Sequence, residues 1–262
     1  MDFPQLILIQ KKLTRRDEMN ILFTDAELKD AIENPKSGTG AGIGLYRNGY
    51  RLYGQNFWGM KPGSEVLYFL NMIQDIEWNT CSVLEIGAGT GKNIIEFVRR
   101  GIKRAVAVEI DSFAVGALVN MLTLIEEAEL ISEGKLAVIK DDVFHFLEYS
   151  TEQFDIVICY GLLHVFKERV LLQKITDLIS KSVKANGYLI LQSLTDKYPA
   201  PTTQGELEGV IVTPEFVRQS FKQEDWELVH WNEDDIFHSH IGSEVDHHHG
   251  SVRAIIQKLS AS

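Results

Sequence analysis

Short runs of apolar residues alternate along the chain with longer stretches whose apolar positions repeat every three or four residues. The short runs are typical of buried strands and the periodic stretches of helices with one buried face. This alternation predicts an α/β fold, and because no long helix separates the last two strands, we expect the last strand to run antiparallel. Helices are predicted near residues 64–76, 92–100, 112–129 and 172–183, and strands near 83–86, 105–108, 135–140, 154–159, 188–194, 226–231 and 252–258.

The stretch at residues 83–98 has the most informative pattern. An apolar strand leads into a turn with glycine at positions 87, 89 and 91, and an apolar helix begins at Ile94. Strand, glycine turn and helix form half of a nucleotide-binding βαβ unit. Glu109 ends the next apolar run, where a carboxylate accepts hydrogen bonds from a ribose diol. The segment therefore predicts a nucleotide site.

Two common phosphate-binding turns do not fit this segment. A dinucleotide turn needs a further glycine where the chain has Lys92. A P-loop needs glycine at the position of Ile86 and serine or threonine at that of Asn93. Both phosphate-binding alternatives fail on named residues. A glycine turn between a strand and a helix that binds no ligand is one interpretation that stays open.

The remaining pattern, Glu85 followed by glycines 87, 89 and 91, resembles motif I of the class I S-adenosylmethionine-dependent methyltransferases. With the later elements, the resemblance extends over roughly residues 60 to 259. It implies a Rossmann-like seven-stranded sheet of order 3-2-1-4-5-7-6, with strand 7 antiparallel and helices on both faces. An N-terminal cap at residues 1–63 would precede one compact cofactor-binding domain at 64–262, with the cofactor at the break between strands 1 and 4.

The same resemblance implies roles for individual residues toward S-adenosylmethionine. Glu109 would bind the ribose hydroxyls, while Glu85 would either approach the methionine amine or orient the turn through backbone amides. After strand 3, Asp142 is our choice for the adenine amine and Asp141 for a helix cap, although both fit as plain caps. The expected cofactor-binding set is Glu85, Gly87, Ala88, Gly89, Thr90, Gly91, Glu109, Ile110, Asp141, Asp142, Val143, Tyr160, Tyr53 and Trp58.

Tyr53 and Trp58 belong to an aromatic segment before the first strand. Its rings show no periodicity, and they follow a glycine-rich stretch at residues 37–44 that has neither strand nor helix signals around it. In methyltransferases of this kind, residues before the first strand often cover the cofactor, so a flap is one interpretation. The other is that these rings only seal the open end of the core.

Histidines provide the candidate chemistry. His164 follows strand 4, where it is placed to remove a proton from an oxygen, nitrogen or thiol acceptor, or else to pack. A second group lies between strands 6 and 7 and forms a weak candidate metal site, because its spacing matches no recognised motif. We favour a non-metal or substrate-lining role for its members, which are His238, His240, His247, His248 and His249.

Composition narrows the class of partner. The formal charge of −11 is unlike that of a protein that wraps nucleic acid, so a small-molecule acceptor is favoured. Two cysteines in apolar surroundings, no signal peptide and no membrane-length apolar run predict a cytoplasmic protein. The alternatives are an enzyme of the same fold that acts on protein or RNA, and a non-catalytic metal- or nucleotide-binding regulator. The sequence carries no signal for the oligomeric state.

Overall fold

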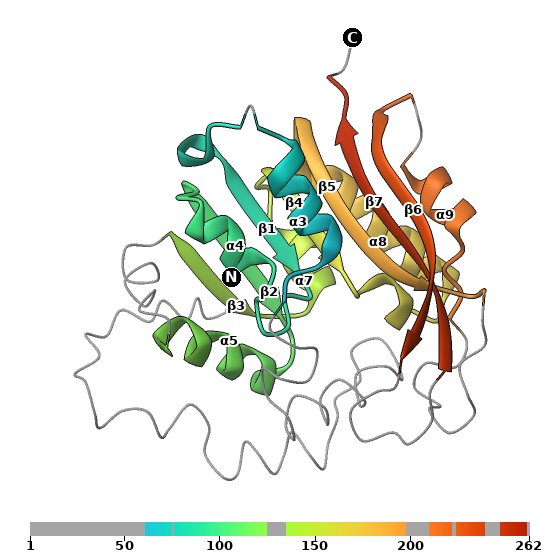
Figure 1. Cartoon of the computed structure of the whole chain (residues 1–262), viewed down its shortest axis with the longest axis horizontal. Helices are drawn as coiled ribbons and strands as arrows, with labels where there is room; N and C mark the ends of the chain where they lie inside the picture. Colours follow the sequence, from blue (N-terminus) through green and yellow to red (C-terminus); the bar gives the residue numbers. More distant parts are fainter. Residues whose placement is uncertain are drawn as a thin grey trace.

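A single seven-stranded sheet forms the centre of the molecule in a computed structural model, which describes residues 61–74, 76–124, 135–197, 210–221, 224–238 and 247–260 (Figure 1). The order is β3-β2-β1-β4-β5-β7-β6, which confirms the predicted topology. The strands are β1 (Ser82–Ile86), β2 (Arg104–Glu109), β3 (Leu136–Lys140), β4 (Phe154–Tyr160), β5 (Val183–Thr195), β6 (Trp226–His238) and β7 (His247–Lys258).

The first five strands are parallel, and β7 runs antiparallel to both of its neighbours. Every residue of β1 is buried, as expected for a central parallel strand covered on both faces. The prediction of an antiparallel last strand is therefore confirmed. β1 pairs with β2 on one side and with β4 on the other. The sheet therefore grows from β1 toward β3 in one direction, and from β4 onward in the opposite direction. The boundary between β1 and β4 is the switch point of the strand order.

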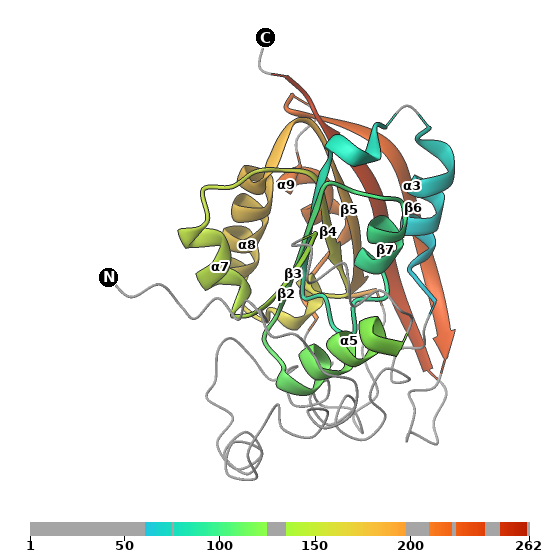
Figure 2. The same ribbon diagram turned by 90° about the vertical axis from the view of Figure 1, so that its left-hand side faces the viewer.

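Helices cover both faces of the sheet (Figure 2). One face packs against α3 (Ser64–Met72), α4 (Ile94–Arg99) and α5 (Ser112–Leu124), and the other against α7 (Val143–Tyr149), α8 (Arg169–Ser182) and α9 (Pro214–Ser220). In the described part of the chain, the short 3-10 helices η2 (Trp78–Thr80) and η3 (Leu163–Val165) connect longer elements. In α8 the residues Leu172, Ile175 and Ile179 are buried on one face, as their spacing predicted.

The last three strands are longer than the sequence pattern indicated. β5 begins at Val183, which the periodicity had assigned to the preceding helix. β6 and β7 extend into a hairpin whose last pair is His238 with His247. The extension consists largely of polar or half-exposed residues, which carry no hydrophobic signal and are ordered by cross-strand pairing.

The N-terminal cap predicted for residues 1–63 lies outside the described residues, except for Lys61, Pro62 and Gly63. Residues 198–209 and 239–246 also lie outside them. Within the described part of the chain, no helix has the length and apolar character needed to span a membrane.

Candidate functional site

The glycine turn lies at the carboxyl end of β1, next to the point where the strand order reverses. In open α/β sheets, ligands bind at this switch point. Gly87, Gly89 and Gly91 have φ angles of 64°, 55° and 75°, which favour glycine. The turn is closed by Gly91 N–H donating to Ala88 O at 2.8 Å and held to β2 by Ala88 N–H donating to Val108 O at 3.0 Å.

The glycines differ in what a side chain would meet. A Cβ at Gly91 would lie 2.1 Å from Leu118 Cδ1, so this glycine allows α5 to approach the turn. At Gly87 the nearest atom, Leu162 Cδ1, would be 3.1 Å away. Gly91 therefore has a packing role in addition to its role in the turn conformation. Ala88 and Thr90, also in the expected set, are buried within the turn.

Glu109, the residue expected to bind the ribose, lies directly against the turn. One carboxylate oxygen, Oε2, accepts the Gly89 amide at 2.8 Å, and Oε1 accepts the Asp111 amide at 2.8 Å. Burial raises the pKa of the Glu109 carboxyl. Glu109 therefore links the end of β2 to the turn that follows β1, and the half-buried Ile110 comes next to it. Asp111, two residues on, accepts the amides of the first turn of α5.

Glu85 is used within the protein. Its Oε1 accepts the Asn93 side-chain amide at 2.8 Å and its Oε2 accepts the Ile94 backbone amide at 2.9 Å. Asn93 Oδ1 in turn accepts the Gly63 amide at 2.8 Å. Burial raises the pKa of Glu85 to about 8. Of the two roles expected for Glu85, the one seen is orientation of the turn, and a contact to a methionine amine stays a prediction.

The helix cap after β3 is formed by Asp142, whereas from the sequence we expected the cap at Asp141. Asp142 Oδ1 accepts the amides of Phe144 at 2.8 Å and His145 at 3.4 Å, so Asp142 is the N-cap of α7. Asp141 accepts the Asp142 amide and pairs with His145 Nδ1 at 2.7 Å. The cap expected at Asp141 thus falls on Asp142, and Val143 begins the helix. An adenine contact by any of them stays a prediction.

Tyr160, at the end of β4, connects the sheet to α3. Its hydroxyl donates to Glu65 Oε2 at 3.1 Å, and burial together with Glu65 raises the pKa of the Tyr160 phenol to about 12. Gly63 packs so closely that a Cβ there would lie 2.3 Å from the Tyr160 ring. Tyr53 and Trp58, the other aromatic candidates, lie outside the described residues.

His164 lies in η3 and is 2% exposed. Its Nδ1 accepts the Leu194 backbone N–H at 3.3 Å, beyond Tyr160↔Gln192, the last pair that β4 forms with β5. The imidazole thus accepts, near the end of β5, a backbone amide that lies beyond the last residue of β4 paired with β5. Burial lowers the pKa of His164 to about 3, with smaller contributions from Lys167 and His249. In this neutral state Nε2 carries the proton, so the ring presents a donor there rather than the lone pair of a general base.

The hairpin separates the remaining histidines. His248 is exposed, while His249 is 3% exposed, because successive residues of a strand point to opposite faces. Among the residues described, no group of three or more His, Cys, Asp and Glu side chains is placed to hold a metal ion. His240 and the side chains of His238 and His247 lie outside that description. The metal candidates stay untested as a set.

Sequence reasoning missed two residues of this region. Glu65 is 3% exposed and receives the Tyr160 hydroxyl, and Asn93 bridges Glu85 to Gly63. Glu65 adjoins Val66 on the buried side of α3, and a carboxylate at such a position is a signal that a partner exists. In the sequence, Asn93 was informative only as a residue that does not fit a P-loop, so its hydrogen bonds to Glu85 and Gly63 were not predicted.

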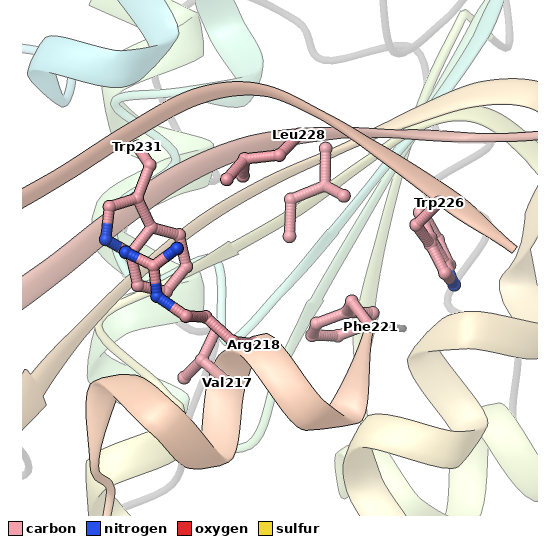
Figure 3. A pocket seen from close by; sticks show the side chains of 7 residues that line it. Val217, Arg218, Phe221, Trp226, Leu228 and Trp231 are labelled. Atoms are coloured by element: carbon pink, nitrogen blue, oxygen red, sulfur yellow. The ribbon is translucent and has the colours of Figure 1, made fainter. Parts of the chain in front are cut away.

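An apolar pocket lies between α9 and β6, at the edge of the sheet (Figure 3). The Arg218 guanidinium lies 3.9 Å from the centre of the Trp231 ring, and Phe221 meets Trp226 edge-on at 5.3 Å between ring centres. Since β7, β5 and β4 separate β6 from β1, this pocket is distinct from the glycine-turn site. It is lined by Val217, Arg218, Phe221, Trp226, Leu228, Trp231 and Ile256.

Comparison with known proteins agrees with this geometry. Residues 83–187, less than half of the chain, match the family model of a methyltransferase domain. They include the glycine turn, Glu109, Tyr160 and His164. The domain match and the sheet order are those expected for a class I S-adenosylmethionine-dependent methyltransferase.

Solved structures share the fold at low identity. The [4+2]-cyclase SpnF has 10% identity over 86% of this chain and 98% of its own, with a TM-score of 0.60. A structure described as "Conversion of a Disulfide Bond into a Thioacetal Group during Echinomycin Biosynthesis" has 16% identity over 84% of this chain and 94% of its own, with a TM-score of 0.58. The N-methyltransferase NodS from Bradyrhizobium japonicum, in complex with S-adenosyl-L-homocysteine, has 16% identity over 69% and 79%, with a TM-score of 0.51. No curated protein sequence matches the chain.

Proposed function

We propose that the protein transfers the methyl group of S-adenosylmethionine to a small-molecule acceptor. The observation that carries this proposal is the contact of Glu109 with the glycine turn: Oε2 accepts the Gly89 amide at 2.8 Å at the switch point of the sheet. A carboxylate offers about four lone-pair sites, and the Gly89 and Asp111 amides each donate to Glu109 at 2.8 Å. A carboxylate at this strand end suits the hydroxyls of a ribose.

The residues around the turn fit the rest of the nucleoside. The positive φ angles of Gly87 and Gly89 keep the backbone without side chains where a ligand approaches. Asp141, Asp142 and Val143, at the carboxyl end of β3, supply carboxylates and an apolar side chain for an adenine. When bound, S-adenosylmethionine supplies a methyl group already activated on a sulfonium. The chain's task is then to orient the acceptor and exclude water.

The charge of the chain supports a small acceptor over nucleic acid. With 37 acidic and 26 basic residues, the protein carries a net charge of −11, which repels a phosphate backbone. Cys81 and Cys159 are both free thiols, which accords with a reducing compartment such as the cytoplasm. A protein or RNA substrate is the alternative, and a basic surface beside the glycine turn would favour it.

Calorimetry with S-adenosylhomocysteine tests the cofactor assignment. We expect wild-type protein to bind it and Glu109→Ala to bind about ten- to hundred-fold more weakly, because hydrogen bonds to charged groups contribute about 1.5–3 kcal/mol. Glu96→Ala removes a carboxylate whose partner is Arg99 on α4, and serves as the control. Absence of binding by wild type overturns the proposal. Equal affinity of Glu109→Ala and Glu96→Ala would show that Glu109 does not bind the ribose. With S-adenosylmethionine, formation of S-adenosylhomocysteine in the presence of an acceptor separates turnover from binding alone.

A further inference from the structure

A bulge in the edge strand β6 shapes the pocket between β6 and α9. Leu228 is paired with Ile256 of β7. Trp231 is paired with Ala254, which lies two residues away from Ile256 and on the same face of β7. In a regular strand, residues three apart point to opposite faces, but the register shifts between Leu228 and His230. Leu228 and Trp231 therefore point to the same face, where both line the pocket opposite α9 (Figure 3).

The pocket suits one apolar side chain better than a whole metabolite. Its volume is about 60 Å³, which is less than half of a cavity of about 150 Å³ that binds benzene. Leu228 is 40% exposed, so the pocket opens to solvent beside it. The rim is polar, because Arg218 pairs with Glu233 at 3.2 Å and Trp231 Nε1 donates to the same carboxylate at 2.8 Å. An apolar centre with a polar rim, built on tryptophan and arginine, is the composition of a protein-binding surface.

β6 also offers its backbone to a partner. It is the last strand of the sheet, and within the described residues no strand pairs with its outer edge. The backbone N–H and C=O groups along such an edge are a template for an added strand. From Trp231 to His238 the pairing with β7 is unbroken, while Val229 in the bulge is not paired with a residue of β7 and is 38% exposed. An extended segment can therefore pair with β6 beyond the bulge and reach the pocket with one side chain.

Charge selects the occupant of this surface. Residues 224–238 contain six acidic residues and neither lysine nor arginine. Those at 233–235 pair with bases of the chain itself, whereas Glu224, Asp225 and Glu227 are exposed beside the pocket. Two copies of β6 placed edge to edge would bring like charges together, in a chain with a net charge of −11. A segment that carries lysine or arginine is complementary to this edge instead.

We propose that β6 and this pocket bind a basic, extended segment of a partner protein. The segment adds a strand to the sheet along residues 231–236 and inserts one leucine-sized side chain between Leu228 and Trp231. Its lysine or arginine side chains lie against the carboxylates at 224–227. The strands β7, β5 and β4 separate this surface from the glycine-turn site, so a partner is held there without covering that site. The inference is independent of the methyl transfer proposed above.

Binding of synthetic peptides to the full chain tests the proposal. The probe is a fluorescein-labelled peptide, Thr-Lys-Val-Lys-Leu-Lys-Val-Lys-Thr, in which lysines alternate with the other residues because Glu227 and Leu228 point to opposite faces of β6. By fluorescence anisotropy, we expect it to bind about ten-fold more tightly than the same peptide with alanine in place of leucine, as burial of one apolar side chain requires. The peptide with glutamate in place of lysine should also bind at least about ten-fold more weakly. Equal affinity of the probe and either of these peptides, or no binding of any, overturns the proposal.

Two lysine substitutions locate the binding surface. Leu228→Lys removes a wall of the pocket and adds a like charge, so it should weaken binding of the leucine peptide about ten-fold or more. Leu67→Lys, at a position on α3 that is 41% exposed against 40% for Leu228, should bind the peptide as wild type does. Circular dichroism during heating checks that both variants are folded. Equal binding of the peptide by the two variants contradicts the assignment of the surface.

Methylation of alternate backbone nitrogens of the peptide tests pairing along the edge. Only one edge of the peptide faces β6, so methylation of one set of nitrogens should abolish binding, and the other set serves as the control. The same effect from both sets, or no effect from either, contradicts the added strand. Sedimentation of the chain without peptide tests the other occupant. A dimer that Leu228→Lys dissociates would assign the surface to a second copy and overturn the proposal.

Discussion

Single atoms determine what each residue of the glycine turn does. At Gly91, both a positive φ and the Leu118 side chain exclude a Cβ. Gly101 has a similar φ of +77° at the end of α4, but no atom lies within 4 Å of the place where its Cβ would be. The two positions therefore separate backbone strain from steric overlap, within neighbouring parts of one domain.

Gly91→Ala should lower the free energy of unfolding by about 2–4 kcal/mol, because strain at positive φ adds to overpacking against the fully buried Leu118. Gly101→Ala should cost only about 1 kcal/mol, from the backbone alone. Urea denaturation of both variants measures the difference. Equal losses of unfolding free energy in the two variants would show that the Leu118 side chain moves aside at no cost in free energy and that the turn accommodates a side chain.

At the same scale, Glu85 shows how a buried carboxylate is retained. Both of its oxygens accept hydrogen bonds from Asn93 and Ile94, so the turn and the first residue of α4 depend on it. Glu85→Ala would leave two buried amides, those of the Asn93 side chain and the Ile94 backbone, without an acceptor, and we expect a loss of about 1–3 kcal/mol in the free energy of unfolding. Thermal unfolding checks this value. Asn93→Ala, which removes one of the same bonds and the bond from the Gly63 amide, should lower the free energy of unfolding by a similar amount.

At the scale of elements, α7 depends on its cap. The helix has only seven residues, and Asp142 Oδ1 accepts the amides of Phe144 and His145 at its start. Phe144 and Leu147 bury the helix against the core beneath α8. Because a helix this short has little stability of its own, the cap and the packing together hold the loop that carries the adenine candidates.

Asp142→Ala should lower the free energy of unfolding by about 1 kcal/mol, while Asp142→Asn should retain most of the stability because its side-chain oxygen still accepts. S-adenosylhomocysteine affinity is a separate measurement on the same proteins. A drop in both variants would indicate that the carboxylate also contacts the adenine amine. An unchanged unfolding midpoint in Asp142→Ala would rule out the cap.

At the scale of the whole molecule, burial decides which groups ionise. The His164 pKa is lowered from 6.5 to about 3, mainly by burial. The unfolded chain therefore binds a proton between these values that the native protein does not, and stability falls as the pH falls through that range. His164→Asn keeps an acceptor for the Leu194 amide but cannot take up that proton.

We expect wild type to lose about 2 kcal/mol more stability than His164→Asn between about pH 7.5 and about pH 5, since one pKa unit corresponds to about 1.4 kcal/mol. Urea unfolding at the two pH values measures this. His248→Gln, an exposed position, should follow wild type. If the stability of His164→Asn depends on pH in the same way as that of wild type, the His164 pKa is not lowered in the native protein.

Much of the architecture could be predicted because it depends on local pattern. The apolar runs at β1, β4 and β5 and the glycine turn define strand, turn and helix within a few residues, and the sheet order followed from the resemblance they carry. The hydrogen bond from the Gly89 amide to Glu109 was not among the expectations, in which Glu109 binds the ribose hydroxyls, and that role stays a prediction. The extent of β6 and β7 was also not expected, because polar hairpins are ordered by their partners rather than by their own hydrophobicity.

The chain alone determined the fold class, the strand, glycine turn and helix at residues 83–98, and the acidic residue that ends the next strand, because burial and glycine stereochemistry act over a few consecutive residues. Only the tertiary structure decided that Glu85 is used by the turn, that Asp142 rather than Asp141 caps α7, and that His249 lies at the same strand end as His164. These outcomes depend on which atoms meet across the sheet. A hydrogen-bonding group has several candidate partners in a sequence, and packing selects among them.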